Sequence, residues 1–440
     1  MMEISELSDR LQRFFQGDAE LAGKVTLFAR RQSKLSASRF LQCLVCGWLA
    51  DPLASLNDLA AFCYATWRVR VSPQGLDARI HRYTVDFFNT MCREALLTLC
   101  PRVRVPIPVL TQFSAVNIAD STGIALPACL ATRWPGSGGT ASPAGLKIQV
   151  VLNFLTGAFH KIWLTNGRTP DQAITRHLSG IRAWSLNLFD LGYFALARLR
   201  AIRDKGAYFC CRLLPGTNVY APSGQKLDLV ALLRRESRDR FELAVQLGHL
   251  LPVACRLCCF RAPKAVVNRR RRQARRNAKK RGRTPTKQTL YLLGWTLLLT
   301  NVPASRADLS QVASLYALRW QVELVFKLWK SQMKIAHIAG TRKERVQVEL
   351  YAKLIGLILF RCVAMPVRSD IVDLSPAKAF KRVAAYSGQL AKQLGSGPAL
   401  GTLLETVQAL IRYFAVREKR KTRVSTVHHL LVGDDCYTSP

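Results

Sequence analysis

Acidic residues are scarce in this chain of 440 residues, which has 28 Asp and Glu against 65 Lys and Arg. The formal net charge is +37 at pH 7. So large an excess of one sign requires a polyanionic partner, and nucleic acid is the leading candidate. An anionic membrane surface is the alternative, but we find no basic amphipathic anchor and no lipidation motif.

Long apolar runs are also missing. No stretch reaches the roughly 20 apolar residues of a transmembrane helix, and residues 1–15 lack the hydrophobic region of a signal peptide. These absences exclude a membrane-spanning protein and predict a cytoplasmic one. The hydrophobic fraction of 49% still provides for real cores, and the length allows two to four domains.

Cysteines are present but poorly arranged for metal binding. The 13 cysteines are scattered, and the two Cys-x-x-Cys pairs, Cys43/Cys46 and Cys255/Cys258, have no partner at a helpful spacing. A structural zinc site needs four such ligands. We expect most of these cysteines to be buried small hydrophobes in a reducing compartment.

The scarcity of acids gives weight to those that remain. Between residues 105 and 200 the only acids are Asp120, Asp171 and Asp190. Asp171 has a simple explanation as a first-turn helix acid. Asp120 and Asp190 each follow a short strand-like run, at the position where open α/β sheets place their sites.

The most informative stretch is Tyr316–Lys330, which holds one acid, Glu323, among three basic side chains. On a continuous helix, Tyr316, Arg319, Glu323 and Lys330 would fall within roughly 60° of one face. The opposite face would be an apolar core stripe: Leu318, Val322, Val325, Leu328 and Trp329. The other acid of this region, Asp308, lies in a polar connector.

Helical spacing of apolar residues predicts helices from the N-terminus to about residue 105, including 40–50, 56–67 and 85–99. Ser55 and Asp58 have the spacing that caps a helix start. The segment 55–82 has the pattern of helix, turn and helix, with basic groups on its second half. We expect a DNA-binding domain here, with a plain helical bundle as the alternative.

From about residue 112 the spacing of apolar residues changes from that of helices to that of strands. Strand-like runs occur at 113–120, 148–154, 159–164, 185–190 and 207–214, with a helix opening at Thr169-Pro170-Asp171 and another over 192–205. This order predicts a mixed sheet with helices between its strands, an α/β fold.

The next region alternates differently. Residues 227–233, 241–247 and 253–260 have the period of antiparallel strands, and a dense basic run follows between Lys264 and Lys287. We expect the run to be a mobile arm that orders on a phosphate backbone. Residues 290–301 return as a strand, and the last hundred residues are mostly helical, with a basic tail around 417–423.

Asp120, Asp190 and Glu323 are therefore three carboxylates on three predicted core elements. Carboxylate oxygens are ligands that Mg²⁺ and Mn²⁺ prefer. Two such ions can activate a water and stabilise a leaving 3′ oxygen. A strongly basic protein with this triad is predicted to cut or join phosphodiester bonds. The alternative is that the acids only neutralise nearby Arg and Lys.

These residues resemble the DDE transposases of the bacterial insertion-sequence-four family. The spacing Tyr-x2-Arg-x3-Glu-x6-Lys from Tyr316 to Lys330 is similar to that family's signature. Asp120, in Asn-Ile-Ala-Asp, and Asp190, in Leu-Phe-Asp-Leu-Gly-Tyr, match its two aspartates. The likeness is strong over about 112–340 and loose at both ends.

The resemblance implies a ribonuclease-H-like mixed-sheet core, interrupted by a β-rich insertion domain and flanked by helical regions. Asp120, Asp190 and Glu323 would hold two Mg²⁺ ions, with Mn²⁺ as a substitute. Tyr316, Arg319 and Lys330 would hold the DNA strand. Trp295 would stack on a flipped base, with a place in the core as its alternative.

The expected organisation has five parts. They are 1–110, a helical N-terminal DNA-binding domain; 111–214, the first part of the catalytic core; 215–290, the β-rich insertion domain with its basic arm; 291–345, the second part of the core with the signature helix; and 346–440, a helical C-terminal region.

By this resemblance the chain would bind the ends of an insertion sequence as a homodimer, cleave them through a hairpin intermediate and join the 3′ ends to target DNA. It would associate with the bacterial nucleoid when bound to DNA. Two alternatives remain: a catalytically silent regulator that occupies the ends, and a metal-dependent nuclease without strand transfer.

Overall fold

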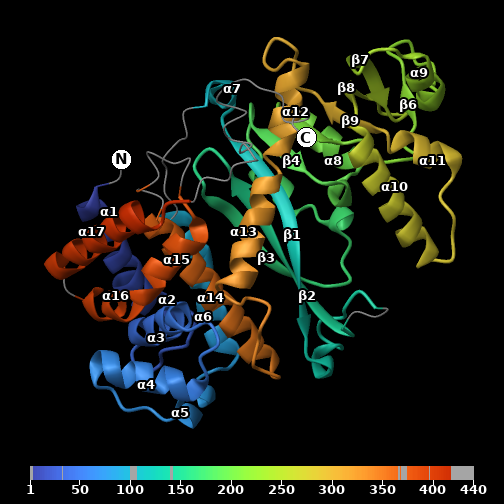
Figure 1. The fold of residues 1–440 in the computed structure, drawn as a ribbon. Helices are drawn as coiled ribbons and strands as arrows, with labels where there is room; N and C mark the ends of the chain where they lie inside the picture. Colours follow the sequence, from blue (N-terminus) through green and yellow to red (C-terminus); the bar gives the residue numbers. More distant parts are fainter. Residues whose placement is uncertain are drawn as a thin grey trace. The chain divides into compact units, whose positions relative to one another are not determined.

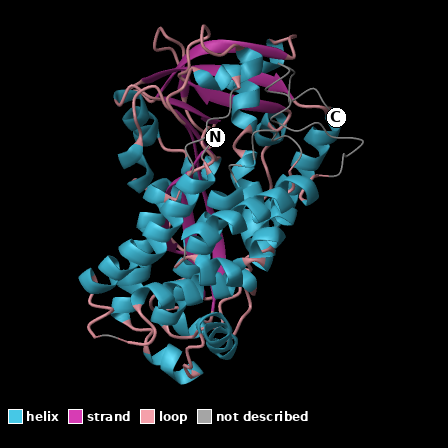
Figure 2. Cartoon of the chain, turned by 90° about the vertical axis from the view of Figure 1, so that its left-hand side faces the viewer, coloured by secondary structure: helices cyan, strands magenta, loops and turns pink. Residues whose placement is uncertain are grey.

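The computed structural model describes residues 3–31, 33–99, 107–138, 142–364, 367, 374–395 and 397–417. Helices and a large sheet make it a mixed α/β protein (Figures 1 and 2), which confirms the α/β class. Two compact units divide the described chain: the first holds 3–99, 121–169 and 322–417, and the second holds 107–120 and 170–321. No helix within the described ranges is both long and apolar enough to cross a membrane.

Helices dominate the first unit, as the apolar spacing predicted. The capping box expected at Ser55 is formed, because the Ser55 and Asp58 side chains each accept the other residue's backbone N–H. The helices of this unit are α1 (Ile4–Arg13), α2 (Ala19–Val25), α3 (Ala37–Ala50), α4 (Leu56–Trp67), α5 (Pro73–Ala78), α6 (Arg82–Thr98), α13 (Trp320–Ser331, from Val322 on), α14 (Lys343–Ala364), α15 (Pro376–Ala385), α16 (Ser387–Gln393) and α17 (Gly397–Phe414).

Helix α14 is the centre of this unit and is buried along most of its length between α3 and α6. Gly356 makes that packing close. A Cβ atom on Gly356 would lie 3.0 Å from the Met333 methyl carbon and 3.6 Å from the Val45 carbonyl oxygen. A larger residue there would push α14 away from α3.

Within the described residues, nine strands form one sheet in the order β3-β2-β1-β4-β5-β9-β8-β7-β6. The first unit contributes β2 (Ala144–Asn153) and β3 (Phe159–Asn166), which pair antiparallel as the predicted hairpin. Strand β1 (Val116–Leu126) passes from the second unit into the first after Asp120.

In the second unit β1 pairs with β4 (Leu186–Phe189) and β4 with β5 (Tyr208–Arg212), both in parallel. Beyond β5 every pairing is antiparallel. The remaining strands of the second unit are β9 (Trp295–Thr300), β8 (Val253–Arg261), β7 (Arg240–Leu247) and β6 (Val219–Tyr220). Helices α7 (Pro108–Thr111), α8 (Leu196–Asp204) and α12 (Leu309–Ala317) also belong to this unit.

Several local predictions for this unit are wrong, and three of them concern residues 227–233, 290–294 and 169–173. Residues 227–233 are not a strand, because Asp228 accepts the N–H groups of Val230 and Ala231 and so starts the helix α9 (Leu229–Arg235). The strand expected from 290 starts only at Trp295, after the helix α11 (Lys287–Leu292). Thr169-Pro170-Asp171 leads only into a short 3₁₀ turn, Asp171–Ala173.

The basic run is an ordered helix, α10 (Lys264–Lys279), instead of a mobile arm. It holds no Gly or Pro and is rich in Arg, Lys, Gln and Ala, which are strong helix formers. Charge density alone therefore gave the wrong local structure. The helix is followed by Gly282, whose φ of +62° is the left-handed conformation that glycine supports best after a helix end. Of the basic tail predicted at 417–423, only Arg417 lies within the described residues.

Candidate active site

Two aspartates meet on adjacent parallel strands of the second unit. Strands β1 and β4 pair from Val116 with Leu186 up to Ala119 with Phe189, so Asp120 and Asp190 are the next two positions. The backbone of Asp190 is still extended, with φ −84° and ψ 171°. Because side chains alternate along a strand and neighbouring strands lie about 4.8 Å apart, both carboxylates stand on the same face.

The sequence placed Asp120 at the end of a strand, and this is wrong. Strand β1 continues to Leu126, so Asp120 lies near its middle. Asp190 does follow directly after β4 and precedes the short 3₁₀ turn Leu191–Tyr193. The parallel pairing that brings the two acids level is a long-range property of the sheet, which a strand pattern alone does not contain.

A buried pair of asparagines fixes this register. The Asn117 side-chain amide donates to the Asn187 side-chain oxygen at 3.1 Å, across a matched pair of residues on β1 and β4. Asn187 also donates to the Tyr208 carbonyl oxygen on β5 at 3.0 Å. A slip by one residue between β1 and β4 would leave these buried polar groups without partners and would place the two aspartates on opposite faces of the sheet. The sequence analysis missed this pair.

Arg319 is the cation beside the first aspartate. Its Nη1 lies 3.6 Å from Oδ2 of Asp120, and the two side chains are 17% and 18% exposed. The guanidinium carbon of Arg319 also lies 5.9 Å from the centre of the Tyr316 ring. The Asp120 carboxylate therefore stands next to a partly buried positive charge.

The predicted single helix from Tyr316 to Lys330 is wrong. Helix α12 ends at Ala317, Leu318 and Arg319 form a turn, and α13 starts at Trp320. The N–H groups of Arg319 and Gln321 bond three residues back, to Tyr316 and Leu318. Tyr316 is buried at the end of α12, so the four signature residues do not share one face of a continuous helix.

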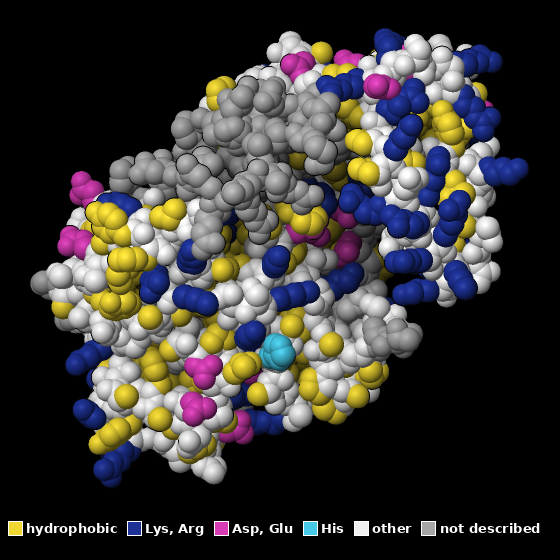
Figure 3. Space-filling view, viewed as in Figure 1, with side chains coloured by type: hydrophobic (Ala, Val, Ile, Leu, Met, Phe, Trp, Pro, Cys, Tyr) yellow, Lys and Arg dark blue, Asp and Glu magenta, His cyan; other side chains and the backbone are white. Residues whose placement is uncertain are grey.

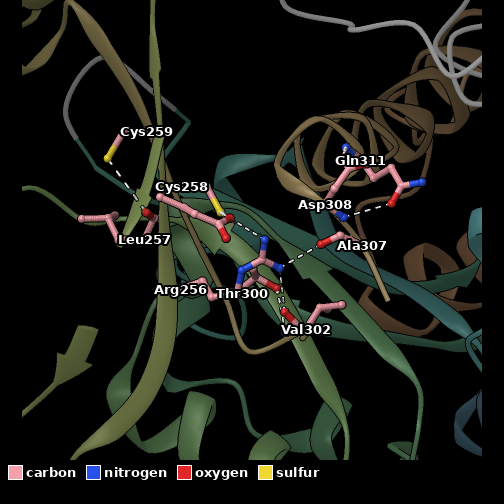
Figure 4. A network of polar contacts seen from close by, with 10 residues as sticks. Arg256, Leu257, Cys258, Cys259, Thr300, Val302, Ala307, Asp308 and Gln311 are labelled. Carbon is pink, nitrogen blue, oxygen red and sulfur yellow. Dashed lines mark hydrogen bonds and ion pairs between the residues drawn. The ribbon is translucent and has the colours of Figure 1, made fainter. Parts of the chain in front are cut away.

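The segment that leads into α12 is held by Arg256 of β8, which is 14% exposed (Figure 4). Its Nη1 donates to the carbonyl oxygens of Val302 and Ala307, both at 2.9 Å, and its Nη2 pairs with Glu242 of β7. Asp308 then caps α12 in a box with Gln311. The sequence analysis missed Arg256, because nothing local distinguishes it from the other arginines.

Arg306 ties the same segment to Gln112, which follows α7 and precedes the strand that carries Asp120. It donates to the Gln112 carbonyl oxygen at 3.0 Å, and the Gln112 amide donates back to the Arg306 carbonyl oxygen at 3.0 Å. Its guanidinium carbon lies 4.6 Å from the centre of the Trp184 ring. The approach to Arg319 is thus held from two sides within the second unit.

Glu323 and Lys330 lie on α13, in the part assigned to the first unit. Glu323 is in the first turn and half-buried, and Lys330 is in the last turn and exposed. The predicted core stripe is buried at Val322 and Trp329 and half-buried at Val325 and Leu328. The Trp329 ring packs edge-on against Phe159 of β3 with ring centres 5.4 Å apart, which anchors α13 in its unit.

Trp295 occupies the core position that the sequence left open as its alternative. It is 3% exposed, with the Phe241 ring edge-on at 5.9 Å and the Arg261 guanidinium carbon 4.4 Å from its ring centre. In this conformation its face is covered by Arg261. Stacking on a base would require Arg261 to leave that face.

The chain is similar to known proteins over most of its length. The family described as the transposase DDE domain matches residues 111–359, more than half of the chain. The chain belongs to the DDE transposases. It is 29% identical to the transposase of the insertion sequence IS231F from Bacillus thuringiensis subsp. israelensis, over 84% of this chain and 82% of that protein. It is 27% identical to the IS1151 transposase of Clostridium perfringens, over 95% and 94%.

DDE transposases typically use divalent metal ions, so we tested the fit of the carboxylates. Asp120 and Asp190 would supply oxygen ligands from one face of two neighbouring strands, which suits Mg²⁺. No three His, Cys, Asp or Glu side chains in the described ranges lie close enough together to hold a metal ion. The two aspartates thus fit as part of a metal site that needs a further ligand.

The Cys-x-x-Cys pairs of this transposase fit a metal poorly. Burial raises the pKa of the Cys46, Cys255 and Cys258 thiols to about 12, whereas zinc binds thiolates. On strand β8, Cys255 and Cys258 are three residues apart and so point to opposite faces. These cysteines are core residues.

Proposed function

We propose that this chain is an active cut-and-paste transposase, with Asp120, Asp190 and Glu323 as its metal ligands. The pairing of Asp120 with Asp190 on one face of β1 and β4 carries this proposal. Glu323 would complete the set as the third carboxylate. When bound, two Mg²⁺ ions would activate the attacking oxygen and stabilise the leaving 3′ oxygen.

The ion pair between Arg319 and Asp120 supports this assignment. It places a cation next to a carboxylate that a metal ion would otherwise neutralise. We propose that Arg319 turns to a DNA phosphate when the metal occupies the site, since a guanidinium binds carboxylate and phosphate with the same geometry. Lys330 and Tyr316 would assist in seating the strand.

For the reaction sequence we propose the one that the resemblance to DDE transposases implies. A water molecule attacks the phosphodiester at the element's end, and the 3′ hydroxyl leaves. That hydroxyl attacks the opposite strand, which closes a hairpin on the element and releases the flanking DNA. A second water opens the hairpin, and the 3′ ends attack target DNA. A homodimer would hold the two ends together.

The same proposal covers the architecture. Strands β1–β5 would form the ribonuclease-H-like core, and β6–β9 with α9–α11 would be the insertion domain. The helices of the first 110 residues would contact the element's ends, with the turn between α4 and α5 as part of a helix-turn-helix. The plain-bundle alternative predicts no loss of end binding when exposed side chains of α5 are replaced.

The test uses the full chain and DNA that carries the inverted repeats flanking its gene. Glu323→Ala is expected to bind these ends with wild-type affinity in Ca²⁺ and to give no cleavage in Mg²⁺. Cleavage at the wild-type rate by this variant would remove Glu323 from the site. A silent regulator would bind without cutting even as the wild type, and a plain nuclease would cut without hairpin or joined products.

A further inference from the structure

The helix α10 divides its basic side chains into two sets with different roles. Arg270 turns inward and donates to the carbonyl oxygens of Leu293 and Trp295 and to the Thr296 hydroxyl. Arg271 also turns inward and donates to the Leu290 carbonyl oxygen at 3.0 Å. These two arginines fasten α10 to the start of β9 and to α11.

The other set faces solvent. Its members are exposed Lys and Arg side chains: Lys264, Arg269, Arg272, Arg275, Arg276 and Lys279. The sequence has no acid from residue 243 to residue 307, so no carboxylate of this segment can neutralise them. The face drawn in Figure 3 carries dense Lys and Arg over the region where α10 lies in Figure 1.

The exposed cations cover a broad arc of the helix. At 100° per residue, Lys264 and Arg275 lie at about 0° and 20°, and Arg276 and Arg269 at about 120° and 140°. Arg272 and Lys279 fall between these two flanks. A helix that rests on a single row of phosphates needs only one narrow stripe of charge, whereas two flanks suit two rows.

We propose that α10 binds in the major groove of duplex DNA, with each flank on the phosphates of one strand. A helix is about 10–12 Å across and the major groove is about 12 Å wide, so α10 can enter it. Its 16 residues span roughly 24 Å. The contacts are to phosphates, so this binding does not depend on DNA sequence.

This role extends the proposed function by naming the surface that holds DNA away from the carboxylates, and it rests on DNA being the substrate. It also explains why the helix is fastened by Arg270 and Arg271. A rigid platform loses less conformational entropy on binding than a mobile arm, so a larger part of its charge energy remains as affinity.

The experiment measures DNA affinity of the full chain against salt concentration, without Mg²⁺, on a duplex of unrelated sequence. Two double variants remove one flank each: Lys264→Ala with Arg275→Ala, and Arg269→Ala with Arg276→Ala. Each is expected to make the slope of log affinity against log salt shallower by about 1.8, since each phosphate contact contributes about 0.9. Thermal unfolding should be unchanged in both.

Arg270→Ala is the matched control on the same helix. It removes the same charge as one outward substitution, but it is expected to lower the unfolding temperature while leaving the salt slope within about 0.5 of the wild type. A salt slope unchanged in both double variants would overturn the role of α10 in DNA binding.

A change of the salt slope in only one of the two flank variants would overturn the groove placement. The same holds if the flank variants lose as much affinity for single-stranded DNA of the same length as for the duplex. Failure of this inference is separate from failure of the proposed function. Wild-type salt slopes in the variants, with normal Mg²⁺-dependent cutting, would reject only the inference. If the flank variants have a shallower salt slope and the wild type never cuts DNA, only the catalytic proposal is rejected.

Discussion

Helices α14 and α10 both carry many charges, and they use them in opposite ways. In α14, Arg345, Glu349 and Lys353 follow at four-residue steps and are 5%, 3% and 0% exposed. In α10 the outward cations are exposed and have no acid in their segment. Charge that is buried must be compensated inside the unit, and charge left outside is available to a polyanion.

The compensation inside α14 is specific. The Lys353 ammonium lies 2.8 Å from Glu349 and donates to the His337 carbonyl oxygen at 2.9 Å. The Arg345 guanidinium lies 3.9 Å from the other Glu349 oxygen. Burial lowers the pKa of both Lys353 and Arg345, and the nearby Glu349 opposes that shift. Glu349 is therefore the acid that both buried cations share, and Asp77 assists it at Arg345 and Asp51 at Lys353.

The largest expected effect on folding comes from removing that acid. Glu349→Gln should lower the free energy of unfolding by about 3–5 kcal/mol, because it removes the nearest counter-charge of two buried cations. Glu344→Gln on the same helix is the control. The Glu344 carboxylate lies 3.6 Å from the ammonium of Lys343, and the Lys343 side chain is largely exposed. That variant should cost less than about 1 kcal/mol in denaturant titration. Equal losses of unfolding free energy in the two variants would show that the buried ion pairs contribute no more to stability than the exposed one.

Arg256 is expected to have the next largest effect. Arg256→Ala removes two bonds to carbonyl oxygens and the counter-charge of Glu242, for a loss of about 2–3 kcal/mol. Hydrogen exchange should rise first in residues 302–308. Arg256→Lys keeps the charge without the fork and should lie between alanine and wild type. Unchanged exchange in this segment would mean that Arg256 does not hold it.

Part of the fold could be predicted from the sequence, and part could not. The apolar spacing located α3, α4, α6 and the β2–β3 hairpin, and the rarity of acids singled out Asp120 and Asp190. Predictions from local patterns failed where a helix cap or a distant contact determines the structure of the segment. The cap Asp228 starts α9 against the strand-like alternation of its sequence. The residues of α10 favour a helix by themselves, and Arg270 and Arg271 decide that it lies against β9 and α11.

The site follows the same rule. The spacing of the signature residues singled out the side chains that we propose for the site, but it implied one continuous helix. Leu318 and Arg319 break it, and Arg319 reaches Asp120 from that break. The Asn117–Asn187 pair and Arg256 belong to long-range contacts, with residues 70 and 46 or more positions away in the chain. The spacing of residue types within one segment contains no information about such contacts.

A much smaller effect is expected on the exposed side of the comparison. Arg272→Ala, in the middle of the outward face of α10, should change the free energy of unfolding by less than about 0.5 kcal/mol. Denaturant titration beside Arg270→Ala provides the contrast on one helix. A loss as large as that of Arg270→Ala would mean that the outward face is packed in solution.

The smallest effect concerns His81, at the start of α6. Burial lowers its pKa, and so do the nearby Arg79, Arg30 and Arg82. The folded state therefore prefers the neutral ring, so stability is lost as pH falls through the ordinary pKa of about 6.5 towards the lower folded value. The unfolding temperature should fall more between pH 7.5 and pH 5.5 in the wild type than in His81→Gln. Identical pH profiles would contradict this.

The pairing of Asp120 with Asp190 is the central claim, and the rate of first-strand cleavage in Mg²⁺ tests it most directly. Replacing partners of metal ligands typically costs 10- to 100-fold, so loss of a ligand itself should cost more than about 100-fold. Asp190→Asn should therefore cut at least that much more slowly, with wild-type stability and end binding in Ca²⁺. Cleavage within tenfold of the wild-type rate would contradict the account.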